Sequence, residues 1–110
     1  MKLLSTFCRE VQAFYGWDKE RDKVFEELSE FQTELSRSPY GRSSREKLLE
    51  ETVDMEICIG HVREHFGFTE AEVNKMMRYK MKRTLDEIQK EKDKLETPLG
   101  KIGERREMTK

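Results

Sequence analysis

Residues 23–31 read KVFEELSEF, and residues 47–55 read KLLEETVDM. Each segment has a lysine, two apolar residues and two acids, and a further acid follows three residues after the second of these acids. On an α-helix, acids at positions i and i+3 lie on one face, about 60° apart. Two helices that packed through the adjoining apolar residues would therefore gather four carboxylates. These are Glu27, Glu30, Glu51 and Asp54.

Helical phase distinguishes these acids from their solvated neighbours. In both segments the acidic pair lies at the edge of the apolar stripe, whereas the remaining acids, Glu26 and Glu50, point away from it. A single acid in such a position is usually solvated, but two matched pairs indicate carboxylates that share a positive partner. Hard divalent cations such as Mg²⁺ take oxygen ligands of this kind.

Composition limits the other classes of function. The chain has 110 residues, enough for one domain, and 41% of them are charged, which is typical of helical proteins. The net charge of −1 favours neither a nucleic acid polymer nor an acidic membrane surface as a partner. No apolar run approaches the ~18 residues of a membrane span, and the N-terminus lacks the pattern of a signal peptide. We therefore expect a cytoplasmic protein, in which Cys8 and Cys58 are buried, reduced thiols.

The first half of the chain is predicted to form two helices. Apolar residues at positions 3, 4, 7, 11 and 14 recur at helical spacing, and Gly16 ends the first helix. Asp18 is the predicted N-cap of a second helix that runs to about Arg37. Residues 36–43 are rich in turn formers and separate the two acidic segments.

Two further helices are predicted in the second half. Capping-box patterns begin at Ser43 and at Thr69, each with a glutamate three residues later. The third helix is expected to run from the first of these patterns to Phe66, and the fourth from the second to about Leu95.

Together these signals predict an all-α fold, a four-helix bundle in one domain over residues 1–96. The charged residues 97–110 are predicted to form a flexible tail. The third helix also carries a second apolar strip, Leu49, Val53 and Ile57, away from its first. Since one small bundle cannot cover both strips, we expect self-association into a homodimer or homotetramer.

The two acidic pairs resemble the motifs of the MazG-like, all-α nucleoside triphosphate pyrophosphohydrolases. That family carries E-x-x-E followed, at a similar distance, by E-x-x-D, and here 20 residues separate Glu30 from Glu51. The resemblance covers roughly residues 12–88. The flanking segments that share it include residues 16–17, 23–28, 50–54 and 66–73.

The resemblance implies a Mg²⁺-dependent hydrolase, with Mn²⁺ as a substitute ion. In the family, the four acids hold the metal, which bridges the triphosphate of a nucleotide. Water attacks between the α- and β-phosphates, and the products are a nucleoside monophosphate and pyrophosphate. By this resemblance Glu27, Glu30, Glu51 and Asp54 are the metal ligands, and either Glu27 or Glu30 takes the proton of the attacking water.

Cations that meet the phosphates are expected on the fourth helix. Relative to Val73, Lys80 falls within the apolar stripe and Arg83 on its flank, whereas Lys75 and Lys82 point outward. Lys80 and Arg83 also match the basic motif of the family, so we predict that they bind the substrate phosphates. A lysine that extends along the edge of a bundle is the alternative for Lys80.

Trp17 and two histidines need separate interpretation. Trp17 is a candidate contact for the nucleobase, although a tryptophan at a bundle corner is more often structural. His61 and His65, with Cys58 one turn earlier, have the spacing of a soft-metal site, but packing or surface roles are more typical. Neither histidine has a glutamate three residues before it, so the Glu-x-x-His pattern of di-iron bundles is missing.

The sequence thus predicts a self-associating nucleotide pyrophosphohydrolase that acts on a (d)NTP. Two alternatives stay open. One is a non-catalytic helical interaction module whose acidic flank keeps it soluble, and the other is a phosphoribosyl-ATP pyrophosphohydrolase from the same superfamily.

Overall fold

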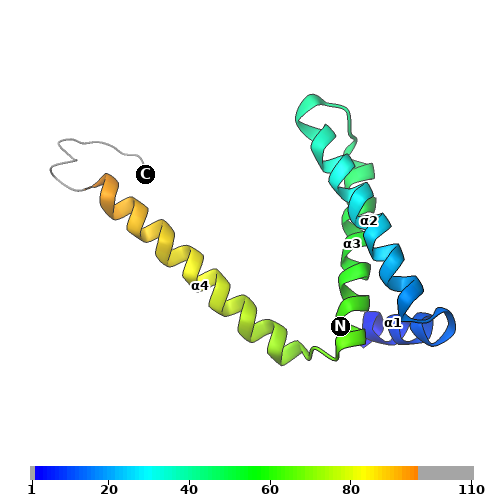
Figure 1. The fold of residues 1–110 in the computed structure, drawn as a ribbon. Coiled ribbons are helices and arrows are strands. Elements are labelled where there is room, and N and C mark those ends of the chain that lie inside the picture. The colour runs from blue at the N-terminus through cyan, green and yellow to red at the C-terminus, as the bar shows by residue number, and fades with distance from the viewer. Residues whose placement is uncertain (1, 97–110) are drawn as a thin grey trace. The chain divides into compact units, whose positions relative to one another are not determined.

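The computed structural model describes residues 2–96, and these form α-helices joined by short connections, with no strand among them (Figure 1). The prediction of an all-α fold is confirmed. The predicted tail at residues 97–110 lies outside the described residues. The elements are α1 (Lys2–Tyr15), α2 (Trp17–Arg37), the 3-10 helix η1 (Ser38–Tyr40), α3 (Arg45–Phe66) and α4 (Glu70–Leu95).

The chain divides into two compact units, residues 1–68 and residues 69–110. The first unit contains α1, α2 and α3, and the second contains α4. Because α4 belongs to a unit separate from the other three helices, the four-helix bundle and the single domain over residues 1–96 stay predictions.

In the first unit, α2 and α3 lie side by side and run in opposite directions, with η1 at the turn between them (Figure 1). Helix α1 crosses the end of this pair at which α2 begins and α3 ends (Figure 1). Gly16 joins α1 to α2 with a φ of 87°, a backbone conformation that side chains other than glycine rarely adopt. This glycine therefore permits the abrupt change of direction between the two helices.

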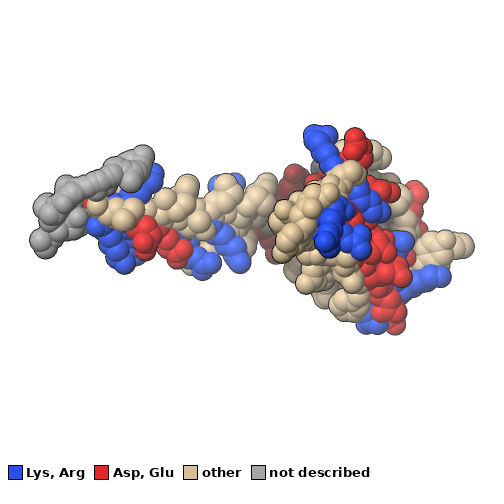
Figure 2. Space-filling view, turned by 90° about the horizontal axis from the view of Figure 1, so that it is seen from above, with Lys and Arg blue, Asp and Glu red and all other residues tan. Residues whose placement is uncertain are grey.

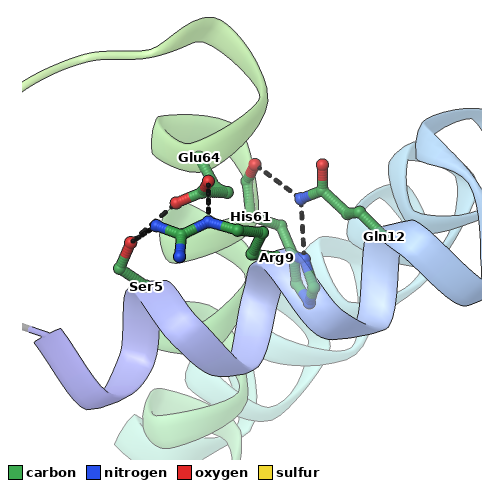
Figure 3. Close-up of polar contacts among 5 residues, drawn as sticks. All are labelled: Ser5, Arg9, Gln12, His61 and Glu64. Carbon is green, nitrogen blue, oxygen red and sulfur yellow. Dashed lines mark hydrogen bonds and ion pairs between the residues drawn. The ribbon is translucent and has the colours of Figure 1, made fainter.

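Polar side chains fasten α1 to α3 (Figure 3). The hydroxyl of Ser5 donates a hydrogen bond of 2.7 Å to Glu64, and Nε of Arg9 donates one of 3.1 Å to the other oxygen of that carboxylate. One turn further along α1, the amide of Gln12 donates to Nδ1 and to the backbone carbonyl of His61, both at 3.0 Å. These bonds fix both the position and the register of α1.

A glycine allows the two helices to approach closely. A Cβ atom added to Gly60 of α3 would lie 2.9 Å from Cγ of Leu4 and 3.2 Å from Sγ of Cys8, both on α1. A larger residue at this position would force the side chain of Leu4, or α1 itself, to move.

The helix ends agree with the predicted ends to within two residues. The capping box at Thr69 and Glu72 is confirmed, with both reciprocal hydrogen bonds formed. The other two predicted caps were wrong. Gly16, and not Asp18, precedes α2, a difference of two positions, and Ser44, and not Ser43, caps α3, a difference of one position. Ser44 accepts a hydrogen bond from the backbone N–H of Lys47 and is therefore the N-cap in place of Ser43.

The first unit buries few apolar side chains. Among its described residues, the buried apolar side chains belong to Cys8 and Cys58, which are free thiols as predicted. The apolar stripe of α2 is only partly covered, since Leu28 is 47% exposed. On α3, Leu49 is 55% exposed and Val53 45% exposed. Much of the apolar surface that the sequence provides is therefore still in contact with solvent.

Helix α4, taken by itself, is amphipathic. Tan side chains run along it in the face drawn in Figure 2, and charged side chains flank them. The exposed apolar residues of α4 are Met76, Met77, Tyr79, Met81, Leu85, Ile88 and Leu95. Within residues 2–96, no helix combines the length and apolar character that crossing a membrane requires.

Candidate functional site

Three of the four predicted acids meet between α2 and α3. Glu27 of α2 and Glu51 and Asp54 of α3 each offer a carboxylate oxygen, and these oxygens all lie within 4.8 Å of one another. Glu51 is only 4% exposed, and Glu27 and Asp54 are half-buried. We refer to Glu27, Glu51 and Asp54 as the acidic cluster.

The lysine that opens each repeated segment contacts one acid of the cluster. Nζ of Lys23 lies 3.9 Å from Oε2 of Glu27, and Nζ of Lys47 lies 3.1 Å from Oε2 of Glu51, both pairs one helical turn apart. In each case the other oxygen, Oε1, is buried without a hydrogen-bond partner. The two halves of the repeat therefore present the same arrangement, a carboxylate held on one side by lysine and unsatisfied on the other.

Burial and mutual repulsion act on Glu27. Loss of solvent raises the pKa of this carboxyl most, and the charges of Glu30 and Asp54 raise it further, while Lys23 opposes them. Leaving buried carboxylate oxygens unpaired is costly, and a bound cation would supply the missing partner. The donor set, three carboxylates without nitrogen or sulfur, suits a hard ion such as Mg²⁺.

Glu30, the fourth predicted acid, is exposed and is not part of the acidic cluster. It lies one turn from Glu27 on α2 and acts on it through its charge. The structure therefore places Glu30 at the edge of the site and brings together only three of the four predicted metal ligands.

A cavity of about 710 Å³ opens beside the acidic cluster. Its volume falls within the range of small-molecule sites, roughly 300–1,000 Å³. Glu27 and Asp54 line it, together with a second polar pair, Glu20 and His61. Its apolar lining comes from all three helices of the unit and includes Phe7, Val11, Tyr15, Val24 and Ile57.

Glu20 was not among the site residues predicted from the sequence. This residue is 5% exposed, and its Oε1 lies 3.6 Å from Nε2 of His61, which is also 5% exposed. A signal was available, because Glu20 precedes Glu27 by two helical turns and His61 follows Asp54 by the same interval. The polar face of each helix thus continues beyond the acidic motif.

The two cysteines are poor candidates for a nucleophile or a metal ligand. Cys58 lines the cavity, but burial, followed by the charges of Glu27 and Asp54, raises its pKa to about 11. Burial likewise raises the pKa of Cys8. Both thiols are therefore protonated at neutral pH, whereas nucleophilic and metal-binding chemistry requires the thiolate.

The remaining predicted site residues lie elsewhere. Trp17 is stacked on His65, with ring centroids 4.1 Å apart and planes 7° apart, and it is not among the residues that line the cavity. Lys80 and Arg83 belong to α4, where the Arg83 guanidinium lies 5.7 Å from the ring centroid of Tyr79. Because α4 is a unit of its own, their proximity to the acidic cluster stays a prediction.

Comparisons of the chain with protein-family models, curated proteins and solved structures found no match.

Proposed function

We propose that the protein is a Mg²⁺-dependent nucleotide pyrophosphohydrolase of the MazG-like type. The observation that carries this proposal is the acidic cluster itself. Its three carboxylates converge from two helices, and the buried Oε1 atoms of Glu27 and Glu51 lack any hydrogen-bond partner. The adjoining cavity offers room for the organic part of a nucleotide.

In this proposal Glu27, Glu51 and Asp54 hold the metal, and Glu30 completes the set from the rim. Bound Mg²⁺ supplies positive charge against the phosphate oxygens and lowers the cost of bringing them to the acids. A base is also needed for the attacking water, and either Glu27 or Glu30 would take its proton. The products are the nucleoside monophosphate and pyrophosphate.

Two further parts of the proposal concern cations and assembly. Lys80 and Arg83 neutralise the substrate phosphates, which carry more charge than one divalent ion can offset. The chain assembles as a homodimer or homotetramer, because the first unit leaves Leu28, Leu49 and Val53 about half exposed. The proposed location of this assembly is the cytoplasm.

The proposal is tested by incubating the purified protein with each common (d)NTP, and with phosphoribosyl-ATP, in the presence of Mg²⁺. Phosphorus NMR identifies the products. We expect monophosphate and pyrophosphate from at least one substrate, and loss of this activity in Glu51→Gln. The matched control is Glu50→Gln, since the side chain of Glu50 is 66% exposed and lies outside the acidic cluster. Release of diphosphate and orthophosphate alone would contradict the proposed reaction.

A non-catalytic interaction module is the second candidate, and the exposed apolar residues favour it. Such a module has no need of the buried, unsatisfied carboxylates. If Mg²⁺ neither stabilises the protein nor supports hydrolysis of any substrate above, while the protein binds a second helical chain, this second function is correct.

A further inference from the structure

The cavity extends well beyond the acidic cluster. Because α2 and α3 are antiparallel, Glu20 faces His61 just as Glu27 faces Asp54. The two acids on α2 are seven positions apart, and their partners on α3 are also seven positions apart, which corresponds to about 10 Å along each helix. Both pairs line the same cavity. A ligand held by its phosphates at the acidic cluster would therefore extend toward Glu20 and His61.

Hydrogen bonds assign the tautomer of His61. The Gln12 amide nitrogen donates to the backbone carbonyl of His61, which fixes the orientation of the amide, and its second hydrogen points to Nδ1 (Figure 3). Nδ1 is therefore an acceptor, and the hydrogen of the neutral ring is on Nε2. Burial lowers the pKa of His61 more than the charge of Glu20 raises it, in agreement with a neutral ring. The cavity thus contains an N–H donor at Nε2.

A carboxylate acceptor lies beside this donor in the cavity. The carboxylate of Glu20 is 3.6 Å from Nε2 of His61, beyond the length of a good hydrogen bond. No closer donor to this carboxylate is found among the described residues. A buried carboxylate next to an imidazole N–H offers one acceptor and one donor side by side.

The surroundings of this polar pair suit a flat ring. Phe7, Val11 and Tyr15 of α1 line the cavity together with Val24 of α2 and Ile57 of α3. Proteins recognise an unpaired nucleobase by stacking or packing its faces against such side chains and by hydrogen bonds to its Watson–Crick edge. That edge presents an N–H next to a ring nitrogen or carbonyl oxygen, which complements Glu20 and His61.

We propose that the Glu20–His61 end of the cavity binds the nucleobase of the substrate. Glu20 accepts a hydrogen bond from an N–H of the base, and Nε2 of His61 donates to the adjacent nitrogen or oxygen. Gln12 is a positioning residue that holds the imidazole in the required tautomer. This inference rests on the proposed function, which places the phosphates at the acidic cluster. The sequence predicted Trp17 as the contact for the nucleobase. In this inference Glu20 and His61 make that contact instead.

The test separates the base from the phosphates by using the four common deoxynucleosides without metal. The full-length protein is titrated with each, and binding is followed by NMR through the ring signals of Phe7 and Tyr15. We expect at least one deoxynucleoside to bind, and its affinity to fall about tenfold in Glu20→Gln. The matched control is Glu10→Gln, an exposed glutamate of α1 outside the cavity, which should leave the affinity unchanged.

If Glu20→Gln does not fold, as judged by circular dichroism, Tyr15→Ala replaces it. Tyr15 is half exposed where it lines the cavity, so truncating it removes a packing surface for the base with little loss of structure. The same tenfold loss is expected.

The outcomes distinguish this inference from the proposed function. If nucleotides are hydrolysed with Mg²⁺ but no deoxynucleoside binds, or binding is unaffected by both variants, the base site is wrong and the hydrolase stands. If deoxynucleosides bind as expected but no nucleotide is hydrolysed, the base site stands and the hydrolase is wrong.

Discussion

Lys23 and Lys47 play the same part in the two repeated segments, since each contacts the glutamate one turn later. Each lysine contacts Oε2 of the acid one turn later, and Oε1 of the same acid is buried without a hydrogen-bond partner. The burial of Glu27 and Glu51 would otherwise leave both carboxylates wholly without a positive partner. The lysine is thus as much a part of each motif as the acids are.

The raised pKa of Glu27 leads to the first prediction. A carboxyl whose folded pKa is raised destabilises the folded protein as pH rises above its ordinary range. Glu27→Gln should therefore melt at a higher temperature than the wild type at pH 8 without metal, with a smaller difference at pH 4. Wild-type protein should gain about 2.7 kcal/mol when Mg²⁺ is present at a hundred times its Kd, and the variant should gain little. Thermal denaturation with and without Mg²⁺ measures both effects, and equal stabilisation of the two proteins would count against Glu27 as a ligand.

Glu64 has the opposite pH dependence. Hydrogen bonds from Ser5 and Arg9 lower the pKa of its carboxyl, so its contribution is present above the ordinary pKa of glutamate and is lost as pH falls through the lowered value. We expect Glu64→Gln to lower the free energy of unfolding at pH 7 and to have a smaller effect near pH 3. Urea denaturation at the two pH values checks this, with the exposed Glu56→Gln on the same helix as control. A loss that is independent of pH would show that the charge of Glu64 is not what stabilises α1.

At the scale of single residues, the sequence predicted the motif acids but not their neighbours in the cavity. Glu27, Glu51 and Asp54 could be predicted because two copies of one pattern show the same flank twice. Glu20 and His61 belong to no repeat, and only the antiparallel pairing of α2 with α3 brings them together. Whether Glu30 is buried could not be predicted either, because helical phase gives a direction on the helix and not the distance to the facing helix.

At the scale of elements, local signals determined the helices well. Capping residues and glycines act within one turn of the chain, so all four helix positions followed from them. The docking of α1 on α3 could not be predicted in the same way. It depends on Gly60, which in an isolated helix would be read only as a residue of poor helix propensity.

Replacing Gly60 by alanine tests this contact. By helix propensity alone the substitution would stabilise α3 by about 1 kcal/mol. We expect destabilisation by about 1–3 kcal/mol instead, because the new methyl group would overlap the side chain of Leu4. Adding Leu4→Ala should make the effect of Gly60→Ala smaller, as measured by urea denaturation of the double-mutant cycle. If Gly60→Ala stabilises the protein, α1 does not pack on α3 as closely as described.

Helix α4 allows an element-scale test of the phosphate contacts. Lys80→Ala and Arg83→Ala should each lower kcat/KM at least tenfold, which corresponds to about 1.4 kcal/mol of transition-state stabilisation. The loss should be the same for every nucleotide that is hydrolysed, since all share the phosphates. Lys75→Ala and Lys82→Ala are the controls. Lys82 pairs with Asp86 at 2.9 Å on the exposed surface of α4, so its removal should have little effect. An essential Lys75 with a dispensable Lys80 would show that the helical phase was assigned wrongly.

At the scale of the whole molecule, a single chain leaves many of its large apolar side chains exposed to solvent. The first unit buries more charged and polar side chains than apolar ones among its described residues, which is the reverse of an ordinary core. The sequence indicated this imbalance through the second apolar strip of α3. It could not specify which surfaces meet, because that depends on the arrangement of separate chains and not on the pattern along one.

The last prediction concerns this assembly. Wild-type protein should sediment as a dimer or tetramer at micromolar concentration, and its melting temperature should rise with concentration. Val53→Glu should shift it toward monomer or unfold it, because an interface would then bury an unpaired charge. In a monomer the same change should be tolerated, since Val53 is 45% exposed on α3. The adjacent exposed Thr52→Glu adds the same charge on another face and should leave the assembly intact. Sedimentation velocity compares the three proteins, and a monomeric wild type, or an equal effect of both variants, would mean that this strip does not join copies of the chain.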